Sequence, residues 1–489
     1  MTLSEAPLSL DEIRARLVAL RDRDLPVHGG RTLAYVYDSG RPDVDALASE
    51  ALAAYGGTNG LDPTAFPSLA VMERDLVRFA ARLLGASDAA GTVTSGGTES
   101  CLLAVYAARE AWRAGDPDRR GQTDRTTRPR IVAPTSVHAA FHKAAHLFGL
   151  ELVLVDVDPV TQRADTAAMG DALDDDTALV VVSAPSYPHG VVDDVTPIAA
   201  AAAARGIRVH VDACIGGWVL PFLSESDCPA WDLTVPGVTS ISVDLHKYGY
   251  ASKGVSLLLH RTAELRRPQV WATAAWPGYA VVNPTLQSTR SGGPLAAAWA
   301  VVAALGVEGF AELARQARAV TLAVAGSVRE GGIPGLRVLV EPDSSLLALT
   351  TDESADVYTV ADELLERGWY AQPQLPYRDT PATLHLTLSA ATARHTDELL
   401  AALREATTAA RAAGPCAVDP ALGAALAGLD PAHLDARGLD GLLAAAGLSG
   451  VGDGGSVELP SRMAPIHTLL AQCPPAVREA LLTAVLERL

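Results

Sequence analysis

The feature that most constrains the fold is an alternation of short apolar runs and Ala/Leu-rich segments between residues 91 and 260. The apolar runs contain few polar residues, which is typical of parallel strands covered by helices on both faces. The alternation therefore predicts an α/β domain, within which the polar residues 115–130 are expected to form an exposed loop. The expected strands are "RIVAP", "ELVLVDV", "ALVVVSAP", "IRVHVDA", "SISVDL" and "VSLLLHR".

Helical patterns lie on both sides of this domain. Residues 9–23 carry apolar residues at three- and four-residue steps, which predicts a short amphipathic helix. A second helix is expected in "PSLAVMERDLVRFAARLLG", with Ser68 as its N-cap and Gly85 as its C-terminal stop. After a helix near 297–330, mixed strand and helix patterns predict a smaller α+β domain. The expected divisions are an N-terminal segment (1–65), a large domain (66–320), a small domain (321–415) and a C-terminal extension (416–489).

Charge and composition exclude several classes of protein. The 57 acidic residues outnumber the 39 basic ones, which disfavours a nucleic-acid binder. The five cysteines are scattered without CxxC spacing, which indicates a reducing compartment. The first thirty residues lack the apolar core of a signal peptide, and no uninterrupted apolar stretch predicts a membrane span. We therefore expect a cytoplasmic enzyme.

A glycine-rich turn in "TVTSGGTESCLLAVYAARE" follows a β-like start and precedes a helix. Backbone N–H groups at a helix N-terminus attract anions, and Gly96 and Gly97 would allow a ligand to approach closely. Thr98 could add a hydroxyl. An ordinary capping turn has the same pattern, so the turn alone does not decide between the two.

Three further segments carry titratable groups. Asp212 ends the strand in "IRVHVDACIGG", where a carboxylate either caps the next turn or pairs with a buried cation. In "TSVHAAFHKAAHLFG", His138, His142 and His146 share a helical spacing, but no nearby acid completes a metal site. We expect no metal, and His138, near the start of the helix, is the histidine expected to face a site.

Two lysines stand close together in "SVDLHKYGYASKG", a stretch otherwise poor in charge. A buried lysine with a depressed pKa can form a Schiff base with a carbonyl group, so Lys247 is a candidate for that role. Pyridoxal phosphate needs a lysine, a carboxylate for its ring nitrogen, an anion site and a flat group for its ring. Lys247, Asp212, the turn at 96–98 and His138 supply one of each.

Six segments resemble the sphingosine-1-phosphate lyase-like family, in the group II decarboxylase-like branch of fold-type I pyridoxal-phosphate enzymes. They occur in the family's order, and the similarity runs from about residue 30 to 415. The resemblance implies a large domain with a mainly parallel seven-stranded sheet, a small C-terminal α+β domain and a homodimer with a shared active site. The segments are "VTSGGTES", "SVHAAFHKAA", "SYPHGVVDDV", "HVDACIGG", "DLHKYGYASKG" and "STRSGG".

The resemblance also implies roles for individual residues. Lys247 would form the Schiff base, Asp212 would keep the ring nitrogen protonated, and His138 would stack on the ring. Lys253 would support catalysis or anion binding, and His189 would lie near the cofactor's phenolic oxygen or the substrate. The residues implied to hold the cofactor phosphate are Gly97, Thr98, Ser242 and His246, with Ser291 and Gly293 contributed by a second subunit.

The segment "GGTNGLDPTAFPSL" resembles the family's substrate-binding segment, which implies substrate-binding positions at Asn59, Asp62 and Phe66. Asp62 departs from the pattern, because the sphingolipid enzymes carry there a histidine that helps to bind the substrate phosphate. A carboxylate at this position would repel a phosphate group.

The reaction implied is a carbon–carbon cleavage, in which a β-hydroxy amine gives an aldehyde. An amino-acid decarboxylase uses the same cofactor and breaks the Cα–carboxylate bond instead, so the substrate is a small amine or amino acid. A scaffold that kept the fold and lost the cofactor is a third reading, which the joint presence of Lys247, Asp212 and His138 disfavours.

Overall fold

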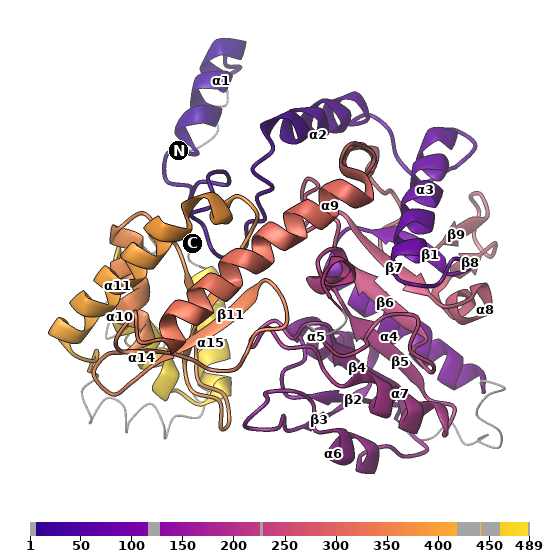
Figure 1. The fold of residues 1–489 in the computed structure, drawn as a ribbon. Coiled ribbons are helices and arrows are strands. Elements are labelled where there is room, and N and C mark those ends of the chain that lie inside the picture. The colour runs from indigo at the N-terminus through magenta and orange to yellow at the C-terminus, as the bar shows by residue number, and fades with distance from the viewer. Residues whose placement is uncertain (1–5, 116–127, 225–227, 418–440, 442–459, 488–489) are drawn as a thin grey trace.

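The computed structural model describes residues 6–115, 128–224, 228–417, 441 and 460–487. Its centre is a seven-stranded sheet with the order β1-β7-β6-β5-β4-β2-β3 (Figure 1). β7 runs antiparallel to its neighbours β1 and β6, and the other strand pairs are parallel, which confirms the mainly parallel sheet. The strands are β1 (Ala90–Thr94), β2 (Arg130–Pro134), β3 (Glu151–Val155), β4 (Thr177–Ser183), β5 (Arg208–Asp212), β6 (Ser240–Val243) and β7 (Ser256–His260).

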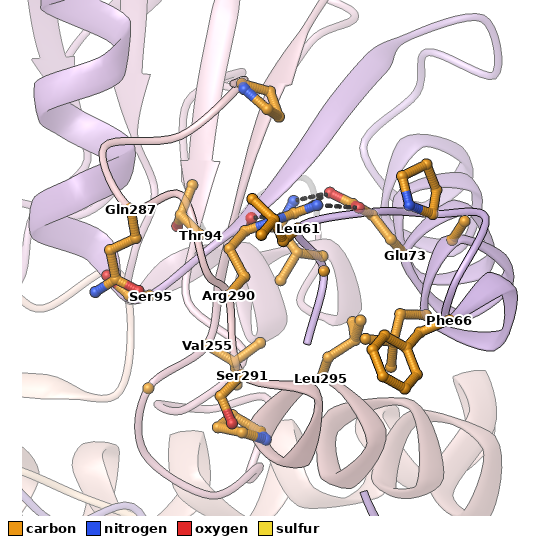
Figure 2. A pocket seen from close by; sticks show the side chains of 18 of the residues that line it. Leu61, Phe66, Glu73, Thr94, Ser95, Val255, Gln287, Arg290, Ser291 and Leu295 are labelled. Atoms are coloured by element: carbon orange, nitrogen blue, oxygen red, sulfur yellow. Dashed lines mark hydrogen bonds and ion pairs between the residues drawn. The ribbon is translucent and has the colours of Figure 1, made fainter. Parts of the chain in front are cut away.

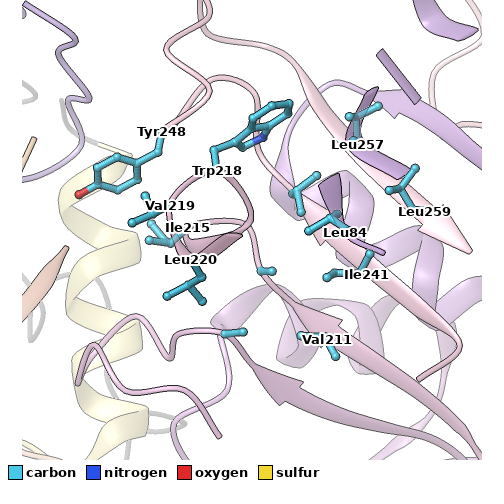
Figure 3. Packing of buried hydrophobic residues seen from close by; sticks show 14 of the residues in the cluster. Leu84, Val211, Ile215, Trp218, Val219, Leu220, Ile241, Tyr248, Leu257 and Leu259 are labelled. Carbon is cyan, nitrogen blue, oxygen red and sulfur yellow. The ribbon is translucent and has the colours of Figure 1, made fainter. Parts of the chain in front are cut away.

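Each of the six expected apolar runs forms one of these strands. Every residue of β4, β6 and β7 is buried, as the lack of polar residues predicts for strands covered on both faces. The large core cluster fills one side of the sheet, where Trp218 packs among aliphatic residues such as Leu84 and Leu257 (Figure 3). Most of the expected loop at 115–130 lies outside the described residues. The helices of this domain include α4 (Gly97–Ala114), α5 (Ala139–Phe148), α6 (Thr166–Asp171), α7 (Val195–Ala203) and α8 (Ala263–Arg266).

The helices before the sheet differ in detail from their predictions. α3 (Pro67–Leu83) has Phe66 as its N-cap and Pro67 at its first position, so the assignment of Ser68 as N-cap is wrong. Proline suits the first helical position because its fixed φ is helical and its missing N–H would be unpaired there. Gly85 follows the helix with a φ of 72°, which confirms it as the stop.

The expected N-terminal helix is confirmed as α1 (Leu10–Ala19). Ser9 and Glu12 close a capping box at its start. No residue of α1 is buried, and the helix projects from the body of the molecule (Figure 1). α2 (Pro42–Ala54) was not predicted, and it packs against the start of a long helix, α9.

α9 (Gly292–Arg329) links the large domain to the small one, and Gly306 kinks it with a φ of 56° and a ψ of −171°. Residues before position 318 belong to the large core cluster, and Val320, Val324 and Val328 belong to the second cluster. Among the described residues α9 alone is long and apolar enough to span a membrane, but half of that stretch is buried inside the protein. Its apolar character is thus explained by packing within the protein.

The small domain has a four-stranded antiparallel sheet in the order β10-β11-β13-β12. Two helices from the C-terminal extension pack nearby, and Asp362 accepts the N–H groups of Met463 and Ala464 where the first of them begins. A two-stranded hairpin, β8 with β9, was not predicted. The bounds are β8 (Trp271–Thr273), β9 (Val281–Asn283), β10 (Leu336–Val338), β11 (Leu346–Thr351), α10 (Val357–Glu366), β12 (Gln372–Gln374), β13 (Thr383–Thr387), α11 (Thr396–Ala413), α14 (Ala464–Gln472) and α15 (Pro475–Leu486).

Candidate active site

A cavity of about 390 Å³ opens where the parallel strands end. The loops after β2, β4 and β6 and the last residue of β5 supply part of its walls, because parallel strands bring their carboxyl ends to one edge of a sheet. The turn after β1 and the start of α4 supply the rest. The structure thus brings together most of the residues predicted for the cofactor, from segments far apart in the chain. Those that line the cavity are Gly96, Gly97, Thr98, His138, Asp212, His246 and Lys247.

Lys247 is paired with a carboxylate that the sequence analysis did not single out. Its Nζ lies 3.0 Å from Oδ2 of Asp244, whose side chain is only 1% exposed. Burial alone would lower the pKa of Lys247, but the charge of Asp244 outweighs it and the pKa lies well above its ordinary value. The expectation of a depressed lysine pKa is therefore wrong for Lys247 in the cofactor-free protein.

Asp244 is buried in a position that needs a counter-ion. Burial would raise its pKa, but the charges and hydrogen bonds of Lys247 and His246 hold the pKa well below its usual range. The carboxylate also lies against the glycine turn, because a Cβ on Gly97 would be 2.6 Å from Asp244 Oδ2. An acid three residues before a lysine, directly after a buried strand, is the signal that could have identified Asp244.

The glycine turn has the geometry of an anion site. Gly96 has a φ of 155° and a ψ of 170°, a region that is essentially restricted to glycine. Gly97 begins the 18-residue helix α4, whose first N–H groups and dipole favour a negative charge. Glu99 fixes the turn, since its carboxylate accepts the N–H of Ser95 at 2.6 Å and that of Leu286 at 2.8 Å.

His138 is the N-cap of α5 and presents an uncharged ring to the cavity. Its Nδ1 accepts the N–H of Ala140 at 3.1 Å, which places the ring proton on Nε2. Burial also lowers the pKa of His138, in agreement with a neutral ring. His142 and His146 do not line the cavity.

Asp212 lines the cavity, whereas Ser242 does not. The Ser242 side chain is fully buried, and its Oγ lies 3.4 Å from Asp212 Oδ1 and 3.1 Å from His210 Nε2. Its implied role in holding the phosphate is therefore not supported, because the side chain faces its strand neighbours rather than the glycine turn.

His189 is also placed differently from the expectation. It is 5% exposed and does not line the cavity, and burial lowers its pKa to about 4. Tyr187, two residues earlier, faces the cavity instead, and its hydroxyl donates to Gln372 Oε1 at 2.8 Å. The segment "SYPHG" was thus correctly identified, but the residue that reaches the cavity is the tyrosine.

Lys253 lies beside this cavity without lining it. Its Nζ donates to the carbonyl oxygens of Tyr35 and His246, both at 3.1 Å, and lies 4.8 Å from the centre of the Tyr37 ring. Burial and the positive charge of Lys247 lower the pKa of Lys253 to about 8. The two lysines are therefore chemically distinct. Tyr37 comes from the N-terminal segment, where no local pattern marks it as a site residue.

The remaining predicted residues gather around a second cavity of about 360 Å³ (Figure 2). Phe66 and Ser291 line it, and the chain at Asn59 pairs with the chain at Ser291 in an antiparallel bridge. Gly293 is buried in the first turn of α9, where a Cβ would lie 3.0 Å from the Leu52 carbonyl oxygen. Ser95 lines both cavities, so the two sites adjoin.

Polar contacts hold the walls of the second cavity. Arg290 makes a double hydrogen bond to Glu73, at 2.8 and 3.1 Å, and Figure 2 shows this pair at the cavity wall. Asp62 lines neither cavity; its Oδ1 accepts the N–H and the hydroxyl of Thr64, which closes a turn. Its predicted part in substrate binding is not supported within a single chain.

Comparison with known proteins decides the family. A family model described as the pyridoxal-dependent decarboxylase conserved domain matches residues 32–332. The chain belongs to this family. A second model, described as the C-terminal putative HTH domain of pyridoxal-dependent enzymes, matches residues 420–488, most of which lie outside the described part of the structure. The predicted decarboxylase-like branch is confirmed.

Individual relatives agree with this assignment. Sphingosine-1-phosphate lyase of Dictyostelium discoideum is 37% identical over 354 residues, which are 72% of this chain and 63% of that protein. The structure of Burkholderia pseudomallei sphingosine-1-phosphate lyase matches with a TM-score of 0.77 and 34% identity, over 84% of this chain and 93% of the other. A probable L-tyrosine/L-aspartate decarboxylase of Methanothrix thermoacetophila is 35% identical over 370 residues, 76% of this chain and 89% of that protein.

Pyridoxal phosphate is the family's cofactor, and the residues of the first cavity fit it. Lys247 would supply the amine for its aldehyde, and Asp212 would supply the carboxylate for its ring nitrogen. A Cβ on Gly96 would meet His246 and one on Gly97 would meet Asp244, so the turn requires glycine, and it leads into the N-terminus of α4. The neutral ring of His138 is available for stacking.

Proposed function

We propose that the protein is a pyridoxal-phosphate-dependent carbon–carbon lyase that cleaves a β-hydroxy amine into an aldehyde and a shorter amine. The observation that carries the proposal is the joint placement of Lys247, Asp212 and His138 around one cavity. The relatives named sphingosine-1-phosphate lyase support the choice of bond, at up to 37% identity.

The cofactor supplies an electron sink for the pair of electrons left on Cα when the Cα–Cβ bond breaks. Asp212 would favour that role by accepting the N–H of the pyridine ring. Lys247 would hold the cofactor through its amine, and in the cofactor-free protein its ammonium group has Asp244 as a counter-ion at 3.0 Å. The site is thus built to accommodate the lysine both as a nucleophile and as a cation.

The reaction requires one group that accepts a proton and one that donates a proton, and the two lysines are the candidates. The β-hydroxyl loses its proton as the aldehyde forms, and Lys253, with a pKa of about 8, is the candidate base. Cα gains a proton in exchange, and the ammonium group of Lys247 is the candidate donor. The electron pair of the broken bond stays on Cα, so no oxidant or reductant is needed. One proton leaves the hydroxyl and one proton is added to Cα, so the number of protons is unchanged.

An amino-acid decarboxylase is the second candidate function. The Methanothrix relative, named as a probable decarboxylase and covered over 89% of its length, favours it. The two functions share the cofactor site and differ in the bond that is aligned with the cofactor ring.

Analysis of the products separates these functions. The purified protein, loaded with pyridoxal phosphate, is incubated with β-hydroxy amines and with L-tyrosine or L-aspartate, and aldehyde and carbon dioxide are both measured. We expect aldehyde from the β-hydroxy amines. Carbon dioxide from the amino acids without any aldehyde would overturn the lyase proposal. Borohydride reduction followed by peptide mapping should place the cofactor on Lys247, with Lys247→Ala as the control.

We also propose that the protein is a homodimer of the cytoplasm. Exposed apolar side chains on α1 and on the β8–β9 hairpin support the dimer, among them Leu17 at 60%, Val18 at 69% and Val282 at 67% exposure. Cys101 and Cys214, which are free thiols next to Asp212, are compatible with a reducing compartment.

A further inference from the structure

A chain of buried polar side chains leads away from Asp212 between two neighbouring strands. His210 precedes Asp212 by two residues on β5, so both side chains leave the same face of the strand. Ser240 and Ser242 stand directly opposite them on β6. None of the four is more than 8% exposed, and His210 and Ser242 have no exposed surface.

Hydrogen bonds connect the four residues in order. Nδ1 of His210 lies 2.9 Å from Ser240 Oγ, and its Nε2 lies 3.1 Å from Ser242 Oγ. Ser242 Oγ in turn lies 3.4 Å from Asp212 Oδ1. Both ring nitrogens of a fully buried histidine are therefore engaged by this one chain.

The protons of this chain can be assigned from the carboxylate outward. A carboxylate only accepts, so Ser242 donates its one proton to Asp212 and must accept from the Nε2–H of His210. Nδ1 of the neutral ring then accepts from the Ser240 hydroxyl. Burial lowers the pKa of His210 to about 4, in agreement with an uncharged ring at neutral pH.

The two oxygens of Asp212 are not equivalent. Oδ1 receives the Ser242 hydroxyl and the backbone N–H of Cys214, at 3.4 and 3.1 Å. Within the described residues, Oδ2 accepts a hydrogen bond only from the thiol of Cys101, at 3.9 Å. The carboxylate is thus anchored through one oxygen, and the other is left for a ligand.

We propose that His210 and Ser242 are positioning residues, which hold Asp212 through Oδ1 so that Oδ2 receives the N–H of the cofactor's pyridine ring. The inference rests on the proposed function, because it requires that pyridoxal phosphate binds in this cavity. Neither residue lines the cavity. His210 and Ser242 can therefore affect cofactor binding only through Asp212 and the ring nitrogen that it contacts.

The test compares two ligands. Cofactor-free wild type, Ser242→Ala and His210→Leu are titrated with pyridoxal phosphate and with its analogue that has carbon in place of the ring nitrogen. Ser242→Thr keeps the hydroxyl. His260→Leu is the matched control, since His260 is an equally buried histidine on β7 whose Nε2 bonds to Gln269 instead. Binding is followed by absorbance, and thermal unfolding is measured alongside.

We expect Ser242→Ala and His210→Leu to lose about tenfold in affinity for pyridoxal phosphate and to bind the carbon analogue as wild type does. Ser242→Thr should recover the preference for the nitrogen. His260→Leu should lower the unfolding temperature without changing that preference. If Ser242→Ala and His210→Leu weaken both ligands equally, or neither, the positioning role is wrong. If wild type itself binds neither ligand, the proposed function fails.

Discussion

Lys247 and Lys253 belong to a chain with only three lysines, and their pKa values shift in opposite directions. Asp244 holds the first as a cation, whereas burial and the neighbouring charge of Lys247 bring the second close to neutrality near pH 8. Two adjacent amines can thereby perform different tasks at one pH. The third lysine, Lys143, is exposed on α5 and serves as an internal reference.

This difference predicts a labelling pattern. Only neutral amines react with acetic anhydride, so in the cofactor-free protein Lys253 should become labelled with a midpoint near pH 8, while Lys247 stays protected at that pH. Lys247→Met removes the like charge and should move the Lys253 midpoint to higher pH. Peptide mass spectrometry measures the labelling at each pH. Equal labelling of both lysines at pH 8 would contradict the assignment.

The Lys247–Asp244 pair should also appear in the stability of the cofactor-free protein. Removing one partner of a buried ion pair leaves the other charge uncompensated, at a cost of about 3 kcal/mol. We expect that cost in the free energy of unfolding for Lys247→Met and for Asp244→Asn, measured in urea. The double variant should lose less than the sum of the two. Additive losses would show that the pair is not coupled.

Sequence patterns located the residues that end or follow strands but not those whose role depends on packing. Lys247, Asp212 and His138 were predicted because each follows or ends a buried strand. Ser242 also stands on such a strand, on the same face as Asp212, but its hydroxyl bonds to His210 and Asp212 instead of lining the cavity. Tyr37 reaches the lysines from a distant segment, and only the tertiary fold reveals it.

At the scale of elements, the start of α4 is the most constrained part of the site. A Cβ on Gly97 would meet both oxygens of Asp244 and the sulfur of Cys214 within 2.9 Å. Gly97→Ala should therefore displace the turn and lower the affinity for pyridoxal phosphate at least tenfold. Gly326→Ala in α9, where no atom lies within 4 Å, is the control, and should stabilise the protein by about 0.5–1 kcal/mol. If Gly97→Ala bound the cofactor with unchanged affinity, the turn at Gly96 and Gly97 would not be the binding site of the cofactor phosphate.

The elements themselves were predictable where the pattern was long and apolar. All six expected strands of the large domain formed, because a sheet covered by helices selects runs of apolar residues. Even β3, at the edge of the sheet and without a buried residue, follows this pattern. The β8–β9 hairpin escaped prediction because its strands are only three residues long and contain no buried residue. At α3 the rigid ring of Pro67 decided the start of the helix, and the polar Ser68 beside it did not.

For the whole molecule, the open question is which chain completes each cofactor site. Ser291 and Asn59 lie at the second cavity of their own chain, whereas the family resemblance implies that Ser291 and Gly293 act across a dimer. If they act in trans, two inactive variants should restore activity when mixed. Lys247→Ala lacks the cofactor amine, and Ser291→Asp places a negative charge near the phosphate while remaining a good N-cap for α9.

Refolding the two variants together should then give heterodimers with one intact site. We expect recovery of a fraction of wild-type activity in the mixture and none in either variant alone. A mixture that stays inactive, although light scattering shows a dimer, would place Ser291 in the site of its own chain. Wild-type activity in Ser291→Asp by itself would remove the residue from the site altogether.

The path of α9 limits how this enzyme could have exchanged parts with its relatives. The expected boundary at residue 320 falls inside the helix, whose earlier part belongs to one hydrophobic cluster and whose end belongs to the other. A recombination event at that point would combine α9 segments from two parents, and the recombinant proteins would have mismatched hydrophobic cores. A small domain exchanged between relatives would therefore need to carry its own share of α9 to complete its core.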